Sequence, residues 1–174
     1  MKLKYMLATG AILFSCTASA QTSAGIAAYN SSPPIQCTSI HGIFLPNAEY
    51  VKSERRAAER GDASAQFRLA VMYYYGQGVP QDYTEAANWF RKAAQLGDAV
   101  AQKNLGVMYG KGEGVPQSHA EAFIWTSISA KSGDSGAVDI RNFAGGNLSV
   151  EELDTAENRI SQLYENIKLR EIHN

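Results

Sequence analysis

Residues 61–96 are GDASAQFRLAVMYYYGQGVPQDYTEAANWFRKAAQL, and residues 97–132 repeat the pattern as GDAVAQKNLGVMYGKGEGVPQSHAEAFIWTSISAKS. Eighteen of the 36 aligned positions hold the same residue, including the glycine–aspartate pair that opens each copy and the tryptophan near its end. A period between 20 and 50 residues indicates an array of stacked structural units. The sequence therefore predicts a solenoid with a 36-residue period.

Each unit carries the signals of two helices joined by a turn. Asp62 and Asp98 are N-cap candidates, and each follows a glycine that is able to end the preceding helix in the left-handed conformation. Glycines and a proline then interrupt the apolar pattern at residues 76–80 and 112–116. Asp82-x-x-Glu85 and Ser118-x-x-Glu121 have the form of capping boxes for the second helices. The expected antiparallel pairs are residues 62–75 with 82–96, and 98–110 with 118–132.

The spacing of the alanines, glycines and tryptophan resembles the Sel1-like repeat, a relative of the tetratricopeptide repeat. The first unit matches in Ala65, Leu69, Tyr73, the Gly76-Gln77-Gly78-Val79 turn, Glu85-Ala86 and Trp89-Phe90-Arg91-Lys92-Ala93-Ala94. The second unit departs from the pattern after its tryptophan, with Thr126-Ser127-Ile128. The resemblance, over about residues 50–140, implies an all-α, right-handed α-solenoid of helix-turn-helix repeats whose members are mostly adaptors. Some secreted relatives bridge each helix pair with a disulfide, but this sequence lacks those cysteines.

The predicted organisation places a repeat array at residues 49–144, with full units at 61–96 and 97–132 between partial ones. Residues 145–174 are expected to form a C-terminal capping helix. It opens with Ser149-x-x-Glu152 and has an apolar stripe at Leu153, Ala156, Ile160, Leu163 and Ile167, possibly reaching Arg170. Residues 21–48 contain Pro33-Pro34 and Pro46 and show no hydrophobic periodicity, so we expect a flexible leader there.

Residues 1–20 have the pattern of a signal peptide. Lys2 and Lys4 precede an apolar run over residues 5–14, and Ala18-Ser19-Ala20 offers a cleavage site before Gln21. We therefore expect a periplasmic or secreted protein. Leu13-Phe14-Ser15-Cys16 is similar to a lipobox, which leaves a lipid anchor at Cys16 as the alternative. If Cys16 is removed, Cys37 lacks a partner for a disulfide within the chain.

Composition and charge exclude several classes of protein. The chain of 174 residues has a formal net charge of −1, which becomes −3 without Lys2 and Lys4. That balance argues against nucleic-acid binding through a general basic surface. With 45% hydrophobic residues the chain suffices for a packed core, and no apolar run approaches the ~20 residues of a transmembrane segment.

No residue pattern indicates catalysis, a cofactor or a metal. His41, His119 and His173 are scattered and have no metal-ligand spacing. The glycines between residues 106 and 114 follow an expected helix and lack a Gly-Lys-Ser/Thr sequence, so they do not form a phosphate-binding loop. We predict a non-enzyme without cofactor or metal. A hydrolase acting on cell-wall material is the less favoured alternative, and it would need an acid, a base and a nucleophile in one cleft.

The expected function is binding of a protein or peptide in the bacterial envelope or outside the cell. Phe67 and Tyr74 lie nearly opposite the core-facing residues of their helix and do not recur, since Lys103 and Gly110 take their places in the second unit. In the Sel1-like family the first helices line the concave side, where solenoids commonly take ligands. Phe67, Tyr74 and Lys103 are therefore the candidate partner-binding residues. Alternatively, the two aromatics pack against the leader or the truncated first unit.

Overall fold

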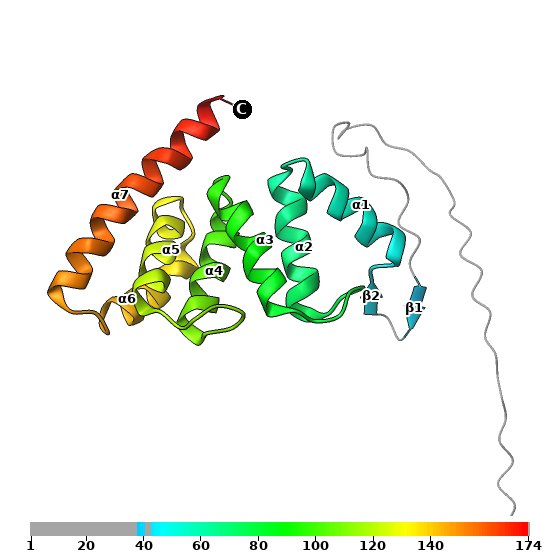
Figure 1. Cartoon of the computed structure of the whole chain (residues 1–174), viewed down its shortest axis with the longest axis horizontal. Helices are drawn as coiled ribbons and strands as arrows, with labels where there is room; N and C mark the ends of the chain where they lie inside the picture. Colours follow the sequence, from blue (N-terminus) through cyan, green and yellow to red (C-terminus); the bar gives the residue numbers. More distant parts are fainter. Residues whose placement is uncertain (1–37, 41–42, 174) are drawn as a thin grey trace, which may run out of the picture. The chain divides into compact units, whose positions relative to one another are not determined.

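The computed structural model describes residues 38–40 and 43–173, with side chains described from Pro46 to Arg170. Consecutive α-helices pack side by side in chain order, and the last helix packs back on α5 (Figure 1). The fold is all-α apart from one short hairpin, as the repeat predicts. Its elements are β1 (Thr38–Ile40), β2 (Ile43–Leu45), α1 (Ala48–Glu59), α2 (Ala63–Tyr75), α3 (Tyr83–Gln95), α4 (Ala99–Lys111), α5 (His119–Lys131), the 3-10 turn η1 (Ser135–Ala137), α6 (Val138–Gly145) and α7 (Val150–His173).

The repeated polar residues cap the helices as predicted. The carboxylate of Asp62 accepts a hydrogen bond from the backbone N–H of Ala65 at 2.9 Å, and Asp98 repeats this contact with Ala101 at 2.8 Å. Asp82 caps α3 and Ser118 caps α5. The two predicted capping boxes do not close, because the backbone N–H groups of Asp82 and Ser118 donate to the carbonyls of Tyr73 and Tyr109, each at 2.9 Å, rather than to the glutamates. Because the same kind of cap recurs every 36 residues, both units begin and end their helices at equivalent positions.

The second glycine of each turn lets one unit sit directly on the unit before it. Gly78 and Gly114 have φ angles of 72° and 69°, in the left-handed region that favours glycine. A Cβ atom on Gly78 would lie 2.7 Å from the carbonyl oxygen of Pro46, and one on Gly114 would lie 2.1 Å from that of Tyr83. No side chain fits at either place, which explains why the glycine is present in both units.

Alanines and a few large side chains fill the space between the helices. Trp89 and Trp125 are buried, and the indole nitrogen of Trp89 donates to Glu85 at 3.2 Å. The same buried polar contact also appears in both units: Gln66 donates to the Ala58 carbonyl, and Gln102 to the Ala94 carbonyl, each at 3.0 Å. The small alanines permit close approach of the helix backbones, and the large side chains fill the remaining volume.

Helix α7 covers the C-terminal end of the array. Ser149 and Glu152 form the predicted capping box, with Glu152 accepting from the Ser149 N–H at 2.8 Å and donating its own N–H to the Ser149 hydroxyl at 3.3 Å. The predicted stripe faces inward, with Ala156, Ile160 and Ile167 buried. Arg159 forms an ion pair with Glu121 of α5. No helix among the described residues is long and apolar enough to cross a membrane.

The expected absence of regular structure in residues 21–48 is wrong at the end of that segment. β1 and β2 pair antiparallel, with Thr38 opposite Leu45 and Ile40 opposite Ile43, and α1 begins at Ala48. Six residues are too few to show periodicity, and the chain after them is held by the close contact between Pro46 and Gly78. The signal peptide, Cys16 and Cys37 lie outside the described residues.

Candidate protein-binding surface

A hollow of about 380 Å³ lies between the first helices of the two full units. We call it the α2–α4 groove. It is lined by Phe67, Val71, Tyr74 and Tyr75 of α2, Phe90 of α3, and Asn104, Val107 and Met108 of α4. Val71 and Val107 are equivalent residues of the two units, so the groove follows the repeat. Its walls are apolar and aromatic apart from the amide of Asn104 and the tyrosine hydroxyls.

A second hollow, of about 230 Å³, adjoins the groove on its N-terminal side. It is lined by Pro46, Tyr50, Phe67, Arg68, Val71, Met72 and Gln77. Phe67 and Val71 belong to both hollows, so Phe67 stands between the truncated first unit and the α2–α4 groove. Its ring centroid lies 5.7 Å from that of Phe90, with the planes tilted by 58°. Phe67 therefore packs against Phe90 of its own unit and also lines an open hollow, and the alternative prediction of packing against the leader or the truncated first unit stays a prediction.

Tyr74 lies at the other end of the groove and is fixed by a contact between the two units. Its hydroxyl donates to the Glu113 carboxylate at 2.8 Å. The hydrogen bond to this carboxylate, together with burial, raises the pKa of Tyr74 to about 12. Tyr74 is thus neutral in any ordinary buffer, and its ring position depends on Glu113.

Lys103 does not join the two aromatics. Its ammonium lies 2.8 Å from the carboxylate of Asp134, and it is not among the side chains lining the α2–α4 groove. The hydrogen bond from Lys103 is the main cause that lowers the pKa of Asp134, which caps the turn η1 through the Gly136 N–H. The structure thus brings Phe67 and Tyr74 into one groove and gives Lys103 a contact with the third, partial unit. As partner-binding residues all three stay predictions.

Two amide side chains give the hollows their polar groups. In the part of the chain that the structure describes, the side chains of Gln77 and Asn104 have no hydrogen-bond partner. The one charged residue in the two linings is Arg68, whose Nε donates to the buried Glu54 at 3.0 Å. Each amide presents a donor and an acceptor, as a peptide group of a ligand requires.

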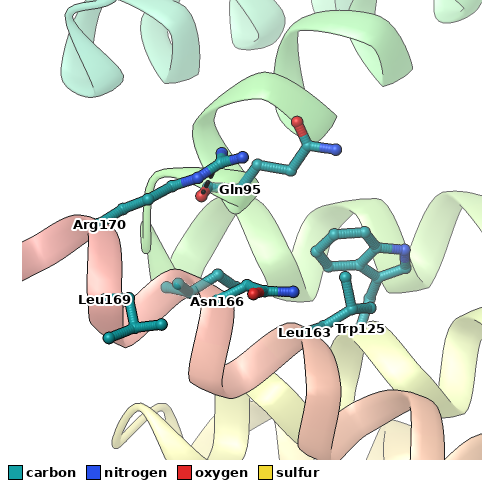
Figure 2. Close-up of a pocket in the computed structure, with 7 residues that line it drawn as sticks. Gln95, Trp125, Leu163, Asn166, Leu169 and Arg170 are labelled. Atoms are coloured by element: carbon teal, nitrogen blue, oxygen red, sulfur yellow. Dashed lines mark hydrogen bonds between the residues drawn. The ribbon is translucent and has the colours of Figure 1, made fainter.

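A third hollow, of about 510 Å³, lies beneath the C-terminal half of α7 (Figure 2). Leu163 and Ile167 of its lining belong to the stripe by which α7 packs, and Trp125 is a buried residue of α5. Arg170 reaches across it toward the Gln95 carbonyl, at 3.5 Å. This hollow lies at the edge of the contact between α7 and α5. It lacks the half-exposed, non-recurring aromatics that mark the α2–α4 groove.

Neither of the two hollows that Phe67 lines combines an acid, a base and a nucleophile. The α2–α4 groove offers one amide and two tyrosine hydroxyls, and one of these hydroxyls is bound to Glu113. Within residues 46–170, whose side chains are described, no three His, Cys, Asp or Glu residues gather as metal ligands would. The arrangement is suited to holding an apolar segment with some backbone hydrogen bonding.

Comparison with known proteins identifies the repeat. The Sel1 repeat model matches residues 63–98 and 99–134, which is the 36-residue period with its boundary placed two residues later. The chain contains two Sel1 repeats. Sel1 repeats generally serve as non-catalytic scaffolds that mediate protein interactions.

Two solved structures share this fold. A protective antigen present in uropathogenic Escherichia coli strains, which displays an SLR fold, is 32% identical over 69% of this chain, with a TM-score of 0.66. A Sel1 repeat protein from Oxalobacter formigenes is 34% identical over 56% of this chain, with a TM-score of 0.53. The chain spans only 26% and 41% of the length of these two proteins. No curated protein sequence matches it.

Comparison of the two units could also have found the groove residues that the sequence prediction missed. Tyr75 is replaced by Lys111 in the second unit, just as Phe67 and Tyr74 are replaced. Phe90 and Asn104 also differ from their equivalents, Thr126 and Arg68, but the difference did not single them out, because Phe90 fits an apolar helix face and Asn104 fits an exposed one. Their place in the groove follows from how α2, α3 and α4 pack.

Proposed function

We propose that this protein is exported and binds a protein or peptide segment in the α2–α4 groove without performing chemistry. The observation that carries the proposal is that half-buried aromatics line an open hollow at positions where the second unit has Lys103 and Gly110. The fold accepts other residues there, so packing alone does not require Phe67 and Tyr74. Aromatic side chains in hollows are the usual anchors of protein interfaces.

The groove's chemistry favours a peptide over a small charged ligand. Apolar side chains of a partner can enter beside Phe67, Val71 and Met108, and the Asn104 amide can pair with a peptide group. The two adjoining hollows share Phe67 and Val71 and lie on either side of α2, which leaves room for an extended segment. General family behaviour supports the same role.

Export is supported by the signal-like residues 1–20 and is tested by intact-mass measurement on protein from the native host. We expect a chain that begins at Gln21. A diacylglyceryl mass on a chain beginning at Cys16 would instead support a lipid-anchored envelope assembly factor, as the lipobox-like Leu13-Phe14-Ser15-Cys16 allows. A chain that retains Met1 would contradict both.

Binding is tested with the double variant Phe67→Ala and Tyr74→Ala. The wild type, the double variant and a control variant are each immobilised and exposed to the native envelope fraction. The proteins that each one retains are identified by mass spectrometry. We expect a protein held by the wild type and lost by the double variant, with the thermal midpoint lowered only modestly because both rings are partly exposed. Phe143→Ala serves as the control, since this aromatic is 70% exposed and lies outside the groove. Equal retention by all three proteins would refute the groove as the site.

A further inference from the structure

Two exposed tyrosine rings lie beside the groove, Tyr75 at the C-terminal end of α2 and Tyr83 at the start of α3. Tyr75 is 64% exposed and Tyr83 is 37% exposed. Both rings pack edge-on against Tyr74, with centroids 4.9 Å and 5.1 Å away. Gln81 fixes Tyr83 further by donating to its hydroxyl at 3.1 Å. Exposed aromatic rings held in place in this way are suited to contact with a ligand.

Several other aromatic rings of this chain already hold a cation of their own. Arg55 lies over Tyr73 at 5.7 Å, Arg91 over Tyr109 at 5.9 Å and Lys92 over Trp89 at 3.7 Å. Over Tyr75 and Tyr83, by contrast, the described residues place no cation. The negative faces of these two rings are therefore available to a positive charge from outside.

The nearby charges favour the same kind of ligand. The Glu113 carboxylate accepts from Tyr74 at 2.8 Å, and the carboxylate of Asp82, next to Tyr83 in the chain, caps α3. Lys111 lies 3.6 Å from the second oxygen of Glu113, and its side chain is 57% exposed. Two acidic groups against one base leave this end of the groove with a net charge of −1, whereas the groove lining itself has no charged residue.

We infer that the tyrosine end of the groove, formed by Tyr75, Tyr83 and Glu113, receives a basic side chain of the bound peptide, with arginine preferred. Arginine stacks on aromatic rings and pairs with carboxylates in one planar group. This inference rests on the proposed function, because it names the chemistry of the peptide that the α2–α4 groove binds.

The separation of Phe67 and Tyr75 along α2 also predicts the spacing between the apolar and the basic residue of the peptide. Tyr75 follows Phe67 by eight positions, which is about 12 Å along a helix axis at ~1.5 Å per residue. An extended peptide advances about 3.3 Å per residue. An apolar anchor beside Phe67 and Phe90 would thus lie three to four residues from the basic side chain.

The second unit cannot form an equivalent site. Lys111 and His119 stand where the first unit has Tyr75 and Tyr83, and Gly110 replaces Tyr74. These differences provide a variant that the helix accommodates: Tyr75→Lys puts into α2 the residue that α4 carries at the equivalent position. Phe143→Lys is the matched control, since it introduces the same charge at an exposed aromatic outside the groove.

The test begins with a phage library of random nonapeptides selected on the full-length exported protein, with counter-selection on the Phe67→Ala, Tyr74→Ala double variant. The enriched peptide is then synthesised with a fluorescent label, in parallel with a copy in which its basic residue is glutamine. Fluorescence anisotropy gives the Kd of both peptides for the wild type, Tyr75→Lys, Glu113→Gln and Phe143→Lys. Thermal unfolding checks that each variant is folded.

We expect enriched peptides with arginine or lysine three to four residues from an apolar side chain. Replacing that residue by glutamine should weaken binding to the wild type about three- to five-fold, as an exposed cation–π contact predicts. Tyr75→Lys should weaken binding of the basic peptide about ten-fold, and Phe143→Lys should leave the Kd unchanged. Glu113→Gln should reduce the salt dependence of binding, because a carboxylate is removed.

Enrichment of apolar peptides without a basic residue would overturn the inference and leave the proposed function intact. The same holds if the glutamine peptide binds as tightly as the basic one. If no peptide prefers the wild type to the double variant, the proposed function itself fails. The sugar chitotetraose is tested as an alternative ligand. If it binds the wild type and not Tyr75→Lys, the tyrosine rings are assigned to a sugar and the inference is overturned.

Discussion

Gly106 decides how closely α4 approaches α5, and α4 carries the groove residues Asn104 and Val107. A Cβ atom at Gly106 would lie 2.6 Å from the Thr126 methyl carbon and 3.2 Å from the Ala122 carbonyl oxygen. Carbon atoms in contact are normally about 3.5–4.0 Å apart. Thr126 is fully buried, and its hydroxyl donates to the Ala122 carbonyl at 2.6 Å, so its side chain cannot turn away without losing that bond.

Gly106→Ala should therefore destabilise the protein even though alanine is the better helix former. Overpacking of a dense interior costs about 1–3 kcal/mol. Alanine inside a helix gains about 0.8–1 kcal/mol over glycine. Because the contact at 2.6 Å is with a side chain that cannot turn away, we take the upper part of the overpacking range, about 2–3 kcal/mol, and expect a net loss of about 1–2 kcal/mol in the free energy of unfolding. For a chain of this size this lowers the thermal midpoint by roughly 2–8 °C.

Thr126→Ser supplies the matched test, because it removes the methyl group that the new Cβ would meet and keeps the hydroxyl. Urea unfolding followed by far-UV circular dichroism measures the wild type, both single variants and the double variant. The double variant should be at least about 1 kcal/mol more stable than the sum of the single effects predicts, since the clash is gone. Additive effects, or a Gly106→Ala variant as stable as the wild type, would refute the assigned contact.

Two further changes test the core and the ion pair between Lys103 and Asp134. Trp89→Ala should cost about 3–5 kcal/mol, because the indole is 6% exposed and bonded to Glu85; an unchanged thermal midpoint would place Trp89 at the surface. Lys103→Met should cost about 1 kcal/mol at pH 7. Lys103 lowers the pKa of Asp134 in the folded protein below 3.8, so the stability that this ion pair adds is present above that pH and is lost as the pH falls. Measured by urea unfolding, the free energy of unfolding should therefore fall less steeply toward acid pH in Lys103→Met than in the wild type. Equal pH profiles would contradict this contact.

Local signals were sufficient to predict most of the helical array. Caps such as Asp62 and Ser118 act within three residues of themselves, and the left-handed turns need only their glycines. The 36-residue period then supplied independent evidence for the helix boundaries, because the two copies are expected to fold in the same way. The C-terminal helix was predictable for the same reason, from Ser149, Glu152 and the stripe that follows them.

Contacts between distant residues were not predictable in this way. The paired strands β1 and β2 have three residues each, too few for a sequence pattern, and Pro46, which follows them, lies close to Gly78, 32 positions away. Lys103 appeared free to bind a partner because its own helix gives it no acidic neighbour on that face. Its ion-pair partner, Asp134, belongs to the next unit.

Differences between the units point to candidate binding residues in this chain, but a difference alone is not sufficient. Phe67 and Lys103 occupy equivalent positions and differ, yet Lys103 is used for a structural ion pair. Phe90 and its equivalent Thr126 also differ, and Thr126 packs so closely on Gly106 that a Cβ atom there would lie 2.6 Å from its methyl carbon. A second criterion is therefore needed: the residue must line an open hollow and keep exposed surface after the fold is complete. On the face between α2 and α4, the aromatics Phe67, Tyr74 and Tyr75 meet both criteria. They all belong to the first unit, so the binding surface should be asymmetric even though the repeat that supports it is nearly regular.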